Sequence, residues 1–281
     1  FLKRQSASGE SIMSRGMAVA ALASVDPVAA ASYAVELLGR KQGFDPRPVF
    51  SAFLSRQGGA AALSSALETK KIAQDVARVG IRLTEPRRAP GDAVGPESQL
   101  IQALRKAAGF SGGPRKLDEK EVARLSRAVV ERGDPARGEE LYHSGELACL
   151  KCHAIGGAGG LVGPDLSSIG TTAQLGYLID SIFDPNKAVK ENYHSTTVVT
   201  KDGRVLTGIK LREAGSELIL RDSEGRELPV RRDNIARRSM GGSLMPSGLT
   251  DSLTSDELRD LLRFLSEIGK IGNYSVGKTP F

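Results

Sequence analysis

Apolar side chains recur at helical spacing through the first 107 residues, with short polar breaks between the runs. Asp-Pro followed by an apolar stretch occurs twice, at Asp26-Pro27 and Asp45-Pro46. Short paired helices with this weak self-similarity favour an α-solenoid of the HEAT type, and a plain helical bundle is the alternative. The pattern predicts helices over 13–25, 28–38, 49–55, 59–67, 72–83 and 98–107.

A turn-rich segment at 108–116 predicts a linker, so we expect one domain over 1–116 and a second over 117–281. The second domain opens with a predicted helix over 117–131. Asp134 is a good N-cap for a further helix over 135–143, because Pro135 suits the first helical position. Near the end, Thr254 and Glu257 form a capping-box pattern that precedes an apolar stripe of Leu258, Leu261, Leu262 and Leu265.

The pattern changes to alternation between about 195 and 236. Thr196–Thr200 is rich in β-branched residues, and Asp202-Gly203 is a strong hairpin signal. Four or five short strands follow one another here, which resembles a small barrel of the SH3 or Sm type. The predicted fold class is therefore mainly α: a HEAT-like helical domain, then a helical domain with a small β-barrel-like insertion. The strands are expected at 196–200, 205–211, 217–221, 227–230 and around 235.

Composition narrows the class of protein. The chain has 281 residues, of which 40% are hydrophobic and 5% aromatic, so a packed core is feasible and a disordered or disulfide-rich chain is excluded. The most apolar stretch is interrupted at Asp26-Pro27, which predicts no membrane span. Residues 1–116 hold 17 Lys and Arg against 9 Asp and Glu. No basic cluster is interleaved with stacking aromatics, so we expect no nucleic-acid partner.

Both cysteines lie in one pentapeptide, Cys149-Leu150-Lys151-Cys152-His153. Two thiols one helical turn apart, followed directly by His, are typical of a c-type haem attachment site. A redox or disulfide Cys-x-x-Cys would make the His incidental, and no thioredoxin-like pattern surrounds it. A zinc site would need a fourth ligand, for which His143 and His194 are the remaining nitrogen donors.

Gly163-Pro164-Asp165-Leu166 follows this pentapeptide, and Met245-Pro246 precedes the final helix. In this order the motifs closely resemble class I cytochrome c. The resemblance implies one covalent haem c, with His153 and Met245 as axial ligands of the iron. It also implies that the Pro164 carbonyl holds the His153 ring. The resemblance further implies that the helix over 135–143 crosses the last helix where Gly138 and Tyr142 meet Phe264.

His153 and Met245 are 92 residues apart, more than in a small cytochrome, because the β-rich segment intervenes. Three phrases are similar to a narrower group, the haem-binding module of Planctomycetes and Verrucomicrobia: Pro185–Tyr193, Lys201–Gly208 and Ser243–Leu249. Its members join a HEAT-like segment to the cytochrome, often at the end of a secreted polypeptide that carries a dehydrogenase. Since the chain begins at Phe1, we expect it to be processed or part of such a polypeptide.

Other residues near these motifs are rival or auxiliary candidates. Met240 is the main rival of Met245, and His194 would give a bis-His haem. We expect Met13 and Met17 to belong to the helical core, together with the apolar face formed by Val28, Ala31, Val35 and Leu38. Further expectations are that Arg237 and Arg238 pair with the haem propionates, with a solvated charged strand edge as the alternative. Gly156–Gly160 lacks the surroundings of a phosphate loop and is interpreted as a flexible loop below the haem.

The resulting hypothesis is a monohaem electron carrier, not an enzyme. Its expected partners are a dehydrogenase that donates electrons and a cytochrome or oxidase that accepts them. Because the resemblance places haem attachment outside the bacterial inner membrane, a periplasmic or secreted location is implied. One alternative is a haem enzyme or gas sensor with a labile sixth ligand. Another is a scaffold that binds a protein or a polysaccharide.

Overall fold

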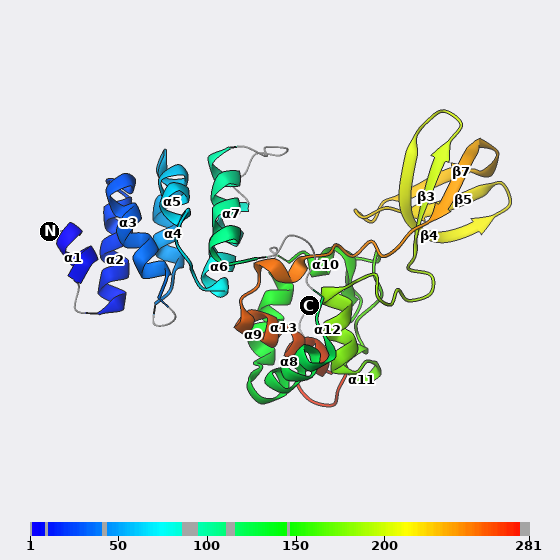
Figure 1. Cartoon of the computed structure of the whole chain (residues 1–281). Helices are drawn as coiled ribbons and strands as arrows, with labels where there is room; N and C mark the ends of the chain where they lie inside the picture. Colours follow the sequence, from blue (N-terminus) through cyan, green and yellow to red (C-terminus); the bar gives the residue numbers. More distant parts are fainter. Residues whose placement is uncertain are drawn as a thin grey trace. The chain divides into compact units, whose positions relative to one another are not determined.

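The computed structural model describes residues 2–8, 11–40, 44–85, 95–110, 116–144 and 147–275 (Figure 1). Within these ranges the chain is mainly helical, with thirteen α-helices and seven short strands. It divides into two compact units: residues 1–113 with 251–255, and residues 114–250 with 256–281. Most of the predicted linker, residues 111–115, lies outside the described residues.

The first unit is built of helices that pack in successive pairs. Its helices are α1 Leu2–Ser8, α2 Ile12–Ala23, α3 Pro27–Leu38, α4 Arg47–Leu54, α5 Gly59–Leu67, α6 Gln74–Thr84 and α7 Pro96–Ala107. Helix α4 contacts both α2 and α6, and α5 contacts both α3 and α7. Each helix therefore packs on its equivalent in the neighbouring pair, which is how repeat solenoids bury their apolar faces. The HEAT identity of the repeats stays a prediction.

Three residues that were predicted to lie in the core of this unit are at its surface. Val28 is 76% exposed, and Met13 and Met17 are 65% and 62% exposed. The helices instead bury small residues such as Ala30 and Ala34, both fully covered. Small side chains let helix axes approach closely, so the packed stripe is narrow and the long methionine side chains lie outside it. The predicted break is confirmed: Asp26 caps α3 by accepting a 3.0 Å hydrogen bond from the Ala29 N–H.

The second unit contains the cysteine-bearing segment. Its helices are α8 Glu119–Arg132, α9 Pro135–His143, α10 Cys149–Cys152, α11 Ile169–Thr172, α12 Leu175–Phe183 and α13 Ser255–Glu267. Asp118 and Glu121 form a reciprocal capping box at the start of α8. Asp134 caps α9 as predicted, by accepting from the N–H groups of Ala136 and Arg137.

Helices α9 and α13 cross in close contact. A Cβ on Gly138 would overlap the Asp260 carbonyl and the Phe264 side chain, so only glycine fits there. Beside the crossing, the Tyr142 and Phe264 rings lie 5.6 Å apart between centroids. Buried Asp260 accepts hydrogen bonds from the Arg137 Nε and the Asp134 N–H, both at 2.8 Å. The structure therefore contains the contacts of Gly138, Tyr142 and Phe264 that the sequence implied.

The five predicted strands are confirmed as one antiparallel sheet (Figure 1). The strands are β3 Ser195–Thr200, β4 Val205–Ala214, β5 Glu217–Arg221, β6 Glu227–Arg231 and β7 Ile235–Met240, in the order β6-β5-β4-β3-β7. A short 3-10 turn, Arg232–Asn234, joins β6 to β7. The strands β6 and β7 are the two edges of this sheet. The expectation of a small β-rich insertion is confirmed. Strands β6 and β7 do not pair with each other, so closure of the sheet into a barrel stays a prediction.

Two irregularities and a small core shape the sheet. The register shifts at Val199/Thr200 between β3 and β7, and at Lys210/Arg212 between β4 and β5. Such bulges increase the local twist. Four buried side chains form its centre, namely Val198, Leu218, Leu220 and Val230. A second, two-stranded sheet pairs β1 Ala154–Ile155 with β2 Ala158–Gly159, directly after the cysteine helix.

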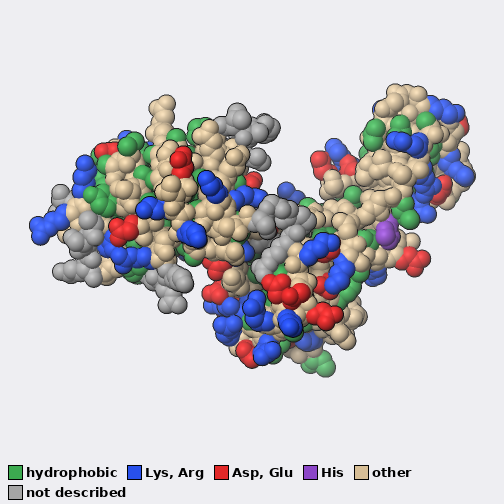
Figure 2. Space-filling view, in the orientation of Figure 1, with side chains coloured by type: hydrophobic (Ala, Val, Ile, Leu, Met, Phe, Trp, Pro, Cys, Tyr) green, Lys and Arg blue, Asp and Glu red, His purple; other side chains and the backbone are tan. Residues whose placement is uncertain are grey.

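Each helix in the described part of the chain is too short or too polar to span a lipid bilayer. On the visible face, cationic and anionic side chains are interspersed rather than gathered by sign (Figure 2).

Candidate functional site

The two cysteines form a single helical turn. Helix α10 runs from Cys149 to Cys152, and the His153 N–H donates a 2.9 Å hydrogen bond to the Cys149 carbonyl. The turn starts at Ala148, whose φ of 55° is left-handed, an uncommon conformation for a residue with a side chain. Both thiols are free and partly buried. Cys149 and Cys152 therefore lie at the two ends of one helical turn, and His153 follows directly as its C-cap.

The His153 ring is fixed by the Pro164 carbonyl. Its Nδ1–H donates a 2.8 Å hydrogen bond to that oxygen, since a carbonyl can only accept. The proton is therefore on Nδ1, and Nε2 keeps a lone pair that can bind a metal. Burial lowers the pKa of His153, although the bond to Pro164 opposes the shift. The hydrogen bond therefore orients the ring, and the lowered pKa favours its neutral form, which metal binding requires.

The glycine-rich segment after His153 is tied to the cysteine helix. The Gly160 N–H donates to the Leu150 carbonyl, and the Gly163 N–H donates to the Cys152 carbonyl, both at 2.7 Å. A Cβ on Gly163 would overlap the His153 ring, and a Cβ on Gly160 would overlap the Lys151 carbonyl. The segment expected to be a flexible loop is therefore held against α10 by backbone hydrogen bonds, and glycine is needed for the close approach.

Tyr142 links the helix crossing to this segment. Its hydroxyl donates a 3.1 Å hydrogen bond to the His153 carbonyl. Tyr142 is 2% exposed, so this bond satisfies a buried hydroxyl. Helix α9 thus makes two contacts: Gly138 packs against α13, and Tyr142 binds the His153 backbone.

The two candidate methionines differ in their surroundings. Met245 is partly buried, and its N–H donates a 3.0 Å hydrogen bond to the Ser243 Oγ. The Ser243 N–H in turn donates 2.9 Å to the Asn186 Oδ1. Met240, at the end of β7, is 78% exposed. The Met245 loop is therefore ordered by specific contacts, whereas the Met240 side chain extends into solvent.

The other candidates have contacts of their own. The Arg238 Nη1 donates a 2.9 Å hydrogen bond to the Glu213 Oε2, so this guanidinium already has a carboxylate partner within the sheet. Arg237 is exposed and precedes it on β7, where successive side chains point to opposite faces. The His194 Nδ1 lies 3.3 Å from the Gly241 carbonyl. The His143 ring packs edge-on against Tyr142. These contacts favour the charged-edge interpretation for Arg238.

The thiol chemistry argues against a redox dithiol. Burial raises the pKa of the Cys149 thiol to about 11 and also raises that of Cys152. Redox-active Cys-x-x-Cys motifs work through a lowered thiol pKa. For the zinc alternative, no group of three or more His, Cys, Asp or Glu side chains in the described ranges is placed to hold a metal ion. A haem iron needs only one or two protein ligands, because the porphyrin supplies the others.

Three residues around this site have contacts that the sequence did not predict. Gly163 packs on the His153 ring, and Asn186 orders the chain leading to Met245. Arg221 of β5 donates a hydrogen bond to the Leu161 carbonyl. Asn186 belongs to the phrase Pro185–Tyr193 that carried the resemblance, but its contact joins segments 57 residues apart. Such long-range contacts leave no local periodic signal in one sequence.

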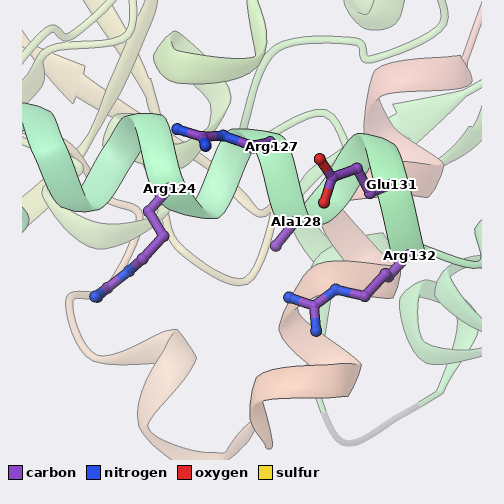
Figure 3. A pocket seen from close by; sticks show the side chains of 5 residues that line it. All are labelled: Arg124, Arg127, Ala128, Glu131 and Arg132. Carbon is purple, nitrogen blue, oxygen red and sulfur yellow. The ribbon is translucent and has the colours of Figure 1, made fainter.

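A charged hollow lies elsewhere, along α8, with a volume of about 320 Å³ (Figure 3). Arg124, Ala128 and Arg132 extend from one side of the helix, and Arg127 and Glu131 from another. Such a polar, single-helix surface lacks the apolar enclosure typical of cofactor pockets. The cysteine segment is therefore the stronger candidate site.

No protein-family model matches the chain, and none of the curated proteins is significantly similar to it. The function of the chain is therefore inferred from the residues of the site.

Proposed function

We propose that the second unit is a monohaem c-type cytochrome domain of the class I kind, whose role is one-electron transfer. One observation carries the proposal. Cys149 and Cys152 occupy one helical turn, and the following His153 donates its Nδ1–H to the Pro164 carbonyl at 2.8 Å. This hydrogen bond orients the partly buried ring and leaves its Nε2 lone pair available, as iron ligation by a histidine requires.

The residues present fit such a group. Cys149 and Cys152 would hold a haem through two thioether bonds, and His153 and Met245 would bind its iron. When bound, the haem supplies an iron centre that gains and loses one electron, and a thioether ligand favours a high reduction potential. Because the Pro164 bond makes the imidazole a better donor, it tunes that potential in the opposite direction.

The chain's own residues then bind and orient rather than transfer protons. Tyr142, Gly163 and Pro164 keep the His153 ring and backbone in place, and Asn186 and Ser243 order the Met245 loop. No nucleophile and base are needed for electron transfer, so we propose that this unit is not an enzyme. A periplasmic or secreted location, a dehydrogenase donor and a cytochrome or oxidase acceptor belong to the same proposal.

Covalent attachment is the direct test. The chain is expressed with a c-type maturation system, denatured in acid and extracted with organic solvent, which removes non-covalent haem. The intact mass of the remaining protein should equal the polypeptide plus one haem, and the Cys149→Ser/Cys152→Ser double variant should carry none. Haem that is extracted completely from the wild-type protein would refute the proposal. His143→Ala is a matched control that should retain the covalent haem, whereas His153→Ala should lose proper iron ligation.

A further inference from the structure

A side chain of the β insertion contacts the segment that holds the His153 ring. Arg221 ends β5, and its Nη1 donates a 2.9 Å hydrogen bond to the Leu161 carbonyl, 60 residues earlier in the chain. The Arg221 side chain is 18% exposed, and its Nη2 lies 3.5 Å from the Glu227 Oε1. The guanidinium is thus sheltered and oriented by a carboxylate on the neighbouring strand.

The receiving segment leads directly to the histidine. Leu161 is 63% exposed, so burial of its side chain does little to hold this part of the loop. The next residue, Val162, is 4% exposed, and a Cβ on Gly225 of the β5–β6 turn would lie 3.9 Å from it. Gly163 then packs on the His153 ring and donates to the Cys152 carbonyl. The Arg221 hydrogen bond therefore fixes the chain just before Gly163, and the β5–β6 turn lies close to the next residue, Val162.

We propose that Arg221 is a positioning residue for His153, and that the β insertion serves to hold the proximal side of the site. By fixing the Leu161 carbonyl, Arg221 keeps Gly163 and Pro164 against the imidazole, which preserves the Nδ1–H bond. The effect on the loop is independent of any cofactor. The effect on an iron ligand rests on the proposed function.

A charge-assisted hydrogen bond suits this role. An arginine donor to a backbone carbonyl is stronger than a neutral pair, and the planar guanidinium can serve Glu227 and Leu161 at once. Arg212 provides a matched control, because its Nη2 lies 3.6 Å from the other oxygen of Glu227. Removing Arg212 disturbs the same carboxylate and sheet without touching the loop.

Amide hydrogen exchange tests the loop directly, in the protein with or without haem. Arg221→Leu should raise the exchange rate of the Gly163 amide about tenfold, the scale of losing one charge-assisted bond. Arg221→Lys should restore most of the protection, since one donor remains. Arg212→Leu should leave Gly163 unchanged. An unchanged rate in Arg221→Leu, or equal effects of Arg221→Leu and Arg212→Leu, would overturn the proposal.

The haem-loaded protein gives a second readout that general destabilisation would not move in a defined direction. A weaker Nδ1–H bond makes the imidazole a poorer donor, so Arg221→Leu should raise the reduction potential relative to wild type, and Arg212→Leu should not. A lowered or unaltered potential in Arg221→Leu would overturn the ligand part of the inference. If the wild-type chain holds no haem, the proposed function fails, and the exchange experiment still decides the role of Arg221.

Discussion

At the scale of single residues, the site depends on which nitrogen of His153 carries the proton. The Pro164 carbonyl selects the Nδ1–H form, whereas a free histidine is free to adopt either tautomer. Burial lowers the pKa of His153 and keeps the ring neutral. The orientation of the ring is set by contacts between protein groups alone, so under the proposed function His153 would be oriented before haem binds.

Gly163→Ala tests this arrangement, since a methyl group there would overlap the imidazole. We expect the ring to be displaced, the Nδ1–H tautomer to lose its dominance, and stability to fall by about 1–3 kcal/mol. Long-range ¹H–¹⁵N spectra of the histidine ring report the tautomer. Gly157→Ala is the control in the same glycine-rich segment: its left-handed φ of 86° disfavours alanine, but nothing lies within 4 Å of the added Cβ, so the His153 tautomer should not change. An Nδ1–H tautomer that persists in Gly163→Ala would contradict this account.

The residues that could be predicted are those with a fixed local spacing. Cys149, Cys152 and His153 are adjacent in the chain, and the resemblance gave the bond between Pro164 and His153 that the structure contains. Arg221 and Asn186 act across 60 and 57 residues. Their partners are backbone atoms, which every residue has, so sequence alone does not single them out.

At the scale of elements, the α9–α13 crossing leaves little room for a larger residue at Gly138. The Gly138 Cα faces the Asp260 carbonyl of the opposite helix, and Asp260 binds Arg137 and the Asp134 N–H. Capping signals predicted the start of α9 well, because a cap is a local feature. The strand order of the sheet is not local, and β7 extends to Met240, beyond the predicted short segment around Ile235.

Gly138→Ala should therefore destabilise the protein by about 1–3 kcal/mol, because backbone on the opposite helix cannot move as a side chain can. Gly176→Ala, in α12, is the matched control. Its Cβ would lie 3.6 Å from the Val122 Cγ1, an ordinary contact, so the gain in helix propensity should leave stability equal or up to about 1 kcal/mol higher. Chemical denaturation measures both. Equal losses in the two variants would show that the crossing is not specially tight.

The β5–β6 turn makes a pH-dependent contribution. Burial alone would raise the pKa of Asp222, but hydrogen bonds from the Arg226 side chain and from the Arg226 and Glu224 N–H groups lower it overall. A lowered folded-state pKa stabilises the fold above the unfolded pKa, and this contribution is lost as the pH falls through the folded value. Asp222→Asn should thus be less stable than wild type at pH 7, with a gap that closes in acid below the ordinary range for aspartate. A gap that is constant from neutral to acidic pH would contradict the assignment.

At the scale of the whole molecule, the chain contains two units with separate apolar cores. The first buries a cluster that includes Leu63, fully covered in α5, and the second buries Leu262 in α13. The predicted first domain, residues 1–116, holds 17 of the 39 Lys and Arg but only 9 of the 33 Asp and Glu. The turn-rich segment at 108–116 predicted where the chain divides, whereas the packing inside each unit needed the structure.

Separate cores predict separate unfolding. Leu63→Ala and Leu262→Ala should each lower the free energy of unfolding of one unit by about 2–5 kcal/mol, the usual cost of such a cavity. The unfolding transition of the other unit should not change. Haem attachment should raise only the transition that Leu262→Ala lowers, because a group bound by one folded unit stabilises that unit. Calorimetry with and without haem measures this. A single transition that shifts with either variant would contradict the independence of the units.

The central proposal is that His153 and Met245 would bind the iron of a covalent haem, and one spectrum tests it most directly. The visible and near-infrared absorption of the matured protein is recorded oxidised and reduced. We predict sharp reduced bands and a weak methionine-to-ferric charge-transfer band, which Met245→Ala abolishes and Met240→Ala retains. Sharp reduced bands without the charge-transfer band would assign the sixth position to another residue, such as His194. A high-spin spectrum in the wild-type protein would contradict the electron-carrier account and favour a haem enzyme or gas sensor.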